Sequence, residues 1–140
     1  MTDEQIKLAR RAVACRGWRW MPGVRAVGRY PHYPVRVHAF GENIQDVEDM
    51  ASSDERLPWQ QAAEYGDSIY PGPYLPDLTD AATVGCLLAL VREVWSDPYL
   101  CAVGDPDTGW RVDAVTAQVQ DLHGYASEAE ALVSALERSP

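Results

Sequence analysis

The chain has 140 residues, of which 46% are hydrophobic and 24% are charged, and its net charge is −9. These values are ordinary for one globular domain and exclude wholesale disorder. We predict a single domain over residues 1–140. It divides into a basic N-terminal part (1–40), an irregular acidic part rich in Pro and Gly (41–77) and a helix–hairpin–helix part (78–140).

The charge is distributed unevenly along the chain. Two acids accompany the eight basic residues before position 37, which gives this stretch a charge of +6, and the remainder carries −15. The basic residues are Lys7, Arg10, Arg11, Arg16, Arg19, Arg25, Arg29 and Arg36. Such an asymmetry can mark a surface for a charged partner. Equally, the basic part can lie on the acidic remainder within one molecule.

The three cysteines are far apart in the sequence, and no two of them have metal-ligand or redox spacing. Cys15, Cys86 and Cys101 are therefore expected to be reduced, buried thiols. Charged residues interrupt the N-terminus too early for a signal peptide, and the longest apolar run is too short to cross a bilayer. We expect a cytoplasmic protein.

The N-terminal part predicts one helix followed by two strands. Thr2 and Gln5 have the spacing of a capping box, which favours a helix over 3–15, and Gly17 is expected to stop it. Residues 24–29 and 35–40 have strand patterns. Residues 41–77 are expected to form a long excursion with one short helix near 59–65.

The C-terminal part predicts a helix, a hairpin and a second helix. Asp77, Thr79 or Asp80 can cap a helix over 80–95, whose apolar residues recur at helical spacing. Inside it Gly85 is unfavourable, and a close backbone contact would explain it. Strands are expected over 99–103 and 110–119, and Ser127 with Glu130 favours a capped helix over 127–138. The fold class is therefore α+β: a small antiparallel sheet with about three packed helices.

Three segments resemble small uncharacterised proteins of phages and prophages. They are residues 75–93, with the PDLTD run and the GCLLALVRE run, residues 9–23, and residues 128–136, with the EAEALV run. The resemblance implies a phage or prophage origin and brings no assigned activity. Small acidic phage proteins are often interaction proteins that block host defence, including anti-CRISPR proteins. Such a link is an analogy of origin rather than of residues.

Two surfaces are candidates for binding a partner. The first combines an acidic run without basic residues and tyrosines among Gly and Pro: Glu42, Asp46, Glu48, Asp49, Asp54, Glu55, Tyr65, Tyr70 and Tyr74. Spaced carboxylates can mimic a phosphate backbone in a basic groove, and rigid aromatic rings suit interfaces. A solvated acidic face, and tyrosines that pack the excursion onto the body, are the alternatives.

The second surface interleaves cations with aromatic rings and could contact nucleic acid. Its residues are Arg16, Trp18, Arg19, Trp20 and Arg25. The alternative is that both tryptophans are core anchors and the arginines lie outside, and the overall negative charge favours it.

No spacing predicts a catalytic or metal site, and we expect no cofactor. His32 and His38 can share one face of a strand, but a metal would need further ligands from elsewhere. The favoured hypothesis is a non-enzymatic phage accessory protein that binds and inhibits a host protein through its acidic surface. A nucleic-acid-binding regulator and a small enzyme of unknown class are the alternatives.

Overall fold

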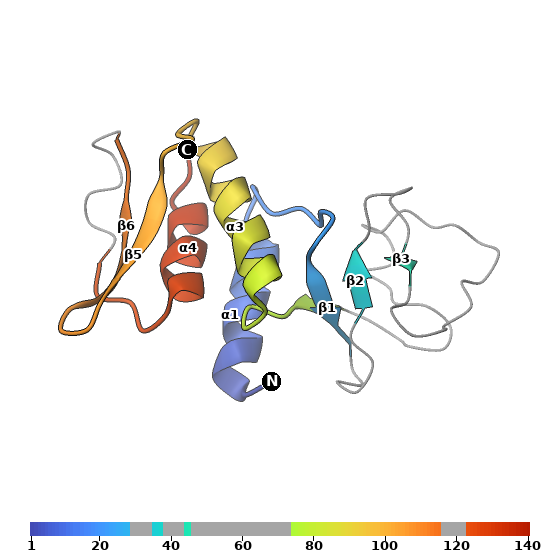
Figure 1. Ribbon diagram of the computed structural model, residues 1–140. Coiled ribbons are helices and arrows are strands. Elements are labelled where there is room, and N and C mark those ends of the chain that lie inside the picture. The colour runs from blue at the N-terminus through green and yellow to red at the C-terminus, as the bar shows by residue number, and fades with distance from the viewer. Residues whose placement is uncertain (29–34, 38–43, 46–73, 116–122) are drawn as a thin grey trace.

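In the part of the chain that the computed structural model describes, three helices lie between two small antiparallel sheets (Figure 1). The structure describes residues 1–28, 35–37, 44–45, 74–115 and 123–140. One sheet has the strand order β3-β2-β1-β4, and the other is the hairpin β5-β6. The α+β class is confirmed, but the strands form two sheets on opposite sides of the helices rather than one.

Helix α1 spans Asp3–Ala14 and begins as the sequence predicts. The Thr2 hydroxyl accepts a hydrogen bond from the Gln5 N–H, and the Gln5 side chain accepts one from the Thr2 N–H at 2.7 Å. Its C-cap is Cys15, so Gly17 does not end the helix. Gly17 instead fills a tight position, because an added Cβ would lie 2.7 Å from Val94 and 2.9 Å from Leu136.

Helix α3 spans Ala81–Val94 and α4 spans Glu128–Glu137. Of the three predicted caps for α3, Asp80 is the one used: it accepts from the Thr83 N–H. Ser127 caps α4 as predicted, while the Glu130 carboxylate accepts from the N–H of Ala126 rather than from that of the cap residue.

The larger sheet contains strands β1 (Arg25–Val27), β2 (Val35–Val37), β3 (Ile44–Gln45) and β4 (Leu75–Pro76). Ala26 in the central strand β1 faces Val35 of β2 on one side and Pro76 of β4 on the other. The strands predicted over 24–29 and 35–40 are thus present in shortened form. Strands β3 and β4 were not predicted, because two-residue strands carry no periodic signal.

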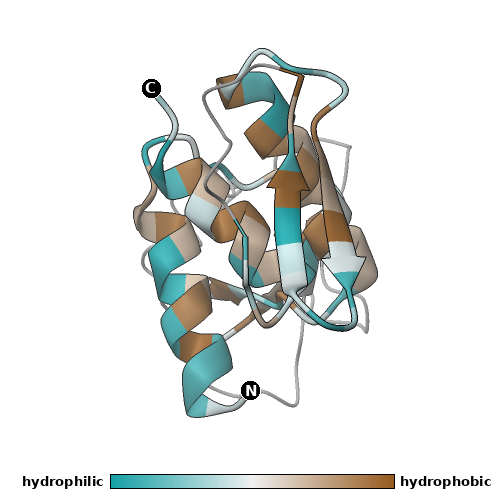
Figure 2. Cartoon of the chain, turned by 90° about the vertical axis from the view of Figure 1, so that its left-hand side faces the viewer, coloured by the Kyte–Doolittle hydropathy of each residue, from teal (hydrophilic) through white to brown (hydrophobic). Residues whose placement is uncertain are grey.

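The hairpin consists of β5 (Cys101–Asp105) and β6 (Gly109–Asp113). It starts two residues later than predicted because the chain still turns at Tyr99, whose N–H donates to the buried Asp97 carboxylate. Seen from the hairpin side, hydrophilic and hydrophobic segments alternate along β6 (Figure 2). Val112 is its buried residue and faces α4 and the core.

The main core lies between the helices and the hairpin. Leu87, Leu90, Leu100 and Leu132 are fully buried there, and the Trp95 indole donates to the Ala135 carbonyl at 2.9 Å. A second, smaller cluster lies under the larger sheet and consists of Trp20, Val24, Ala26, Val37 and Tyr74. Among the described helices, none is long and apolar enough to cross a membrane.

Candidate functional site

The N-terminal arginines lie against carboxylates from the second half of the chain. Four long-range ion pairs make this connection: Arg11 with Glu137, Arg19 with Glu93, Arg25 with Asp77 and Arg36 with Asp80. Three of them are bidentate, and the Arg25 to Asp77 distance is longer, at 3.5 Å. At these four positions the basic part therefore lies on the acidic remainder within one molecule.

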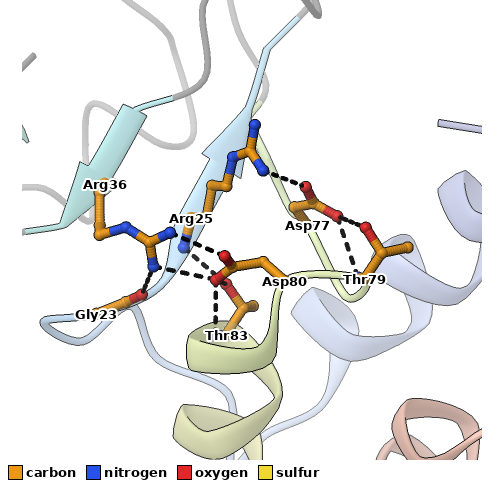
Figure 3. Close-up of polar contacts among 7 residues, drawn as sticks. All are labelled: Gly23, Arg25, Arg36, Asp77, Thr79, Asp80 and Thr83. Carbon is orange, nitrogen blue, oxygen red and sulfur yellow. Dashed lines mark hydrogen bonds and ion pairs between the residues drawn. The ribbon is translucent and has the colours of Figure 1, made fainter. Parts of the chain in front are cut away.

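The densest polar network joins the larger sheet to the start of α3 (Figure 3). Arg36 donates to both oxygens of Asp80, at 2.8 and 3.0 Å, and also to the Gly23 carbonyl at 2.7 Å. Asp80 accepts from both the N–H and the hydroxyl of Thr83, whose hydroxyl oxygen in turn accepts from the Arg25 N–H. None of the buried side-chain nitrogen and oxygen atoms of these residues lacks a partner, as a structural network requires.

Asp77 extends the network on the other side of β1. Its Oδ1 accepts from the N–H and the hydroxyl of Thr79, and its Oδ2 lies near the Arg25 guanidinium. The PDLTD run thus supplies a strand residue, a turn carboxylate, a core leucine and a helix cap. The residues of this run therefore stabilise the fold, and their contacts involve no ligand.

Arginine partners favour the ionised form of two of these carboxylates, Asp80 and Glu137. Hydrogen bonds from Arg36 hold the pKa of Asp80 well below its usual range, and those from Thr83 act in the same direction. Arg11 lowers the pKa of Glu137 in the same way. A lowered pKa makes a carboxylate a weaker proton acceptor, so both ion pairs stabilise the charged form of these groups.

The predicted aromatic–basic surface is not continuous in the structure. Trp20 is only 9% exposed, and Trp18 packs against both core clusters with its ring edge-on to Trp20, at a centroid distance of 5.6 Å. Arg19 and Arg25 are held in ion pairs. Of the five residues, only Arg16 is an exposed cation for which the described residues provide no ion pair.

Most of the predicted acidic and tyrosine surface lies outside the described residues. This applies to Glu42, Asp46, Glu48, Asp49, Asp54, Glu55, Tyr65 and Tyr70, and also to His32 and His38. Tyr74 is described, and it is 4% exposed within the smaller core cluster. Its ring packs beside Gly28 of the polypeptide that follows β1. Because it is buried there, Tyr74 does not contribute to an exposed binding surface.

A cleft of about 420 Å³ opens between the C-terminal ends of α1 and α4. It is lined by Arg11, Ala14, Cys15, Arg16, Leu136, Glu137, Ser139 and Pro140. Burial raises the pKa of the Cys15 thiol, which donates to the Arg11 carbonyl, so this thiol is not an activated nucleophile. Within the described ranges, no three His, Cys, Asp or Glu residues converge as metal ligands.

Comparisons with protein-family models, with curated proteins and with solved structures find no match to this chain.

Proposed function

We propose that the chain is a non-enzymatic accessory protein of phage origin that binds and inhibits a host protein with a basic surface. A nucleic-acid-binding effector of host defence, such as a CRISPR component, has the required charge. The binding groups would be the carboxylates of residues 42–55, which occupy a groove that normally holds nucleic acid.

The observation that carries this proposal is the internal use of the arginines. Each ion pair sums to zero, so the net charge of −9 is carried by residues outside the six ion pairs of the described part. Residues 42–55 contribute six acids and no base to that excess. Four N-terminal arginines are already paired with carboxylates elsewhere in the chain. Each would have to leave its partner before it could neutralise an acid of residues 42–55.

The attachment of residues 38–73 also supports the proposal. Val37 ends β2 and Tyr74 precedes β4, and these two strands flank the same central strand β1. Arg36 and Asp80 join the two sides through their ion pair. The segment that carries the acidic run is therefore joined at its two ends to strands of one sheet.

A matched pair of charge variants tests the proposal. One variant carries Asp46→Asn, Glu48→Gln and Asp49→Asn, and the control carries Asp3→Asn, Glu4→Gln and Asp107→Asn at exposed positions. Both lose three negative charges. A partner is first captured from host lysate at low salt and identified by mass spectrometry, and its affinity for each purified variant is then measured by calorimetry.

We expect the first variant to bind at least about tenfold more weakly than the control, with a smaller salt dependence, because it loses charges at the interface itself. Equal affinity of the two variants would contradict a role for the acidic run. Failure to capture any protein with a basic surface would contradict the proposal as a whole.

A further inference from the structure

We propose that the cleft between the C-terminal ends of α1 and α4 binds a small organic anion, a carboxylate or phosphate monoester with an apolar body, through Arg16. This inference is independent of the proposed partner surface, because it uses none of residues 42–55.

The size and lining of the cleft suit such a ligand. A volume of about 420 Å³ falls within the range of small-molecule sites. Ala14 and Pro140 provide exposed apolar walls, and Ser139 provides a hydroxyl that can donate or accept. A ligand with an aromatic or aliphatic body and one anionic group matches this combination.

The two arginines that line the cleft differ in their partners. Arg11 is committed to Glu137 by two hydrogen bonds of 2.9 and 2.8 Å, and it also donates to the Ser134 hydroxyl. Arg16 lines the same cleft, and no carboxylate of the described residues pairs with it. Its guanidinium is thus available for bidentate contact with a carboxylate or phosphate.

The helix ends themselves oppose an anion, because the C-terminus of an α-helix carries partial negative charge. Arg11 in the last turn of α1 and Arg138 at the C-cap of α4 offset this charge. Arg138 also acts on the Glu137 carboxylate. Among the arginines that line the cleft, Arg16 is thus the one without an ion pair to a side chain of the described residues.

The test follows the backbone amide signals of the isotope-labelled full chain by NMR during titration with phenyl phosphate and, separately, benzoate. We expect saturable shifts confined to residues 11–16 and 134–140 with at least one of the two probes. Phenol and sodium chloride at matched concentrations are expected to leave these signals unchanged, because the first lacks the charge and the second lacks the apolar body.

Two arginine variants separate the cleft from general ion pairing. Arg16→Gln should weaken binding by about tenfold or more, as expected for loss of a charged hydrogen-bonding group. Arg10→Gln, also on the basic stretch but outside the cleft lining, should bind as the unaltered chain does. Shifts that do not saturate, or equal affinities of the two variants when both show the native NMR spectrum, would overturn the proposal.

Discussion

Arg36 of β2 donates to both carboxylate oxygens of Asp80, the residue that caps the N-terminus of α3. One carboxylate therefore accepts hydrogen bonds from two elements (Figure 3). It caps a free N–H in the first turn of α3, and it binds the Arg36 side chain of a strand that is distant in the sequence. The side chain of Asp80 is 15% exposed, so water competes weakly for these contacts. This relationship couples the position of the larger sheet to the start of the central helix.

The two contributions of Asp80 can be separated by substitution. Asp80→Asn keeps an oxygen for the cap but loses the charge, and we expect it to lower the free energy of unfolding by about 1–2 kcal/mol. Asp80→Ala also loses the cap, which adds about 1 kcal/mol. Urea unfolding followed by far-UV circular dichroism measures both. If the alanine variant were as stable as the asparagine variant, the cap would contribute nothing.

Acid should weaken the fold through the same residue. The folded-state pKa of Asp80 is lowered, so the unfolded chain binds more protons than the folded chain below about pH 4. The stability that Asp80 contributes is thus complete at neutral pH and is lost as the pH falls below that value. Glu137 acts in the same direction. Urea midpoints between pH 7 and pH 2.5 should fall, and the Asp80→Asn variant should show the shallower slope.

Asp97 holds the turn between α3 and β5 to the segment that follows β6. It is 3% exposed, and its two carboxylate oxygens accept from the N–H groups of Tyr99 and Val115, at 3.0 and 2.9 Å. Asp97→Asn would turn an amide NH₂ toward one of these donors. We expect a loss of about 1–2 kcal/mol in urea unfolding, because one part-buried N–H loses its charged acceptor. An unchanged midpoint would show that water replaces the lost contact.

Local signals predicted the helices well. Thr2 with Gln5, Asp80, and Ser127 all precede apolar residues at helical spacing, and each begins a helix where the sequence indicates. Capping depends on residues within four positions, so the sequence alone contains the information. The core face of α3 follows for the same reason, and its residues Leu87 and Val91 are fully buried.

Long-range pairings could not be predicted in the same way. No sequence spacing connects Arg36 with Asp80 or Arg11 with Glu137, because these contacts arise only when distant elements pack together. For the same reason Tyr74 resembled a surface anchor among turn residues, although it closes the smaller core cluster. Charge counting indicated that the two halves of the chain could meet, but it could not show which residues do so.

The two helix-associated glycines should respond to alanine in opposite ways. A Cβ at Gly85 would have no described atom within 4 Å, so the structure shows no close contact there of the kind that its sequence position suggests. Gly85→Ala should raise the free energy of unfolding by about 0.5–1 kcal/mol, since alanine is the better helix former.

Gly17 provides the opposite case. A Cβ there would meet Val94 at 2.7 Å and Leu136 at 2.9 Å, where α3 and α4 pack together. The Leu136 side chain can rotate, but the β-branched Val94 is stiff, so Gly17→Ala should cost about 1–3 kcal/mol through overpacking. Thermal and urea unfolding of the two variants side by side measure the contrast. Destabilisation by Gly85→Ala would mean that something does pack against that face of α3, and a neutral Gly17→Ala would mean that the helices can separate at little cost.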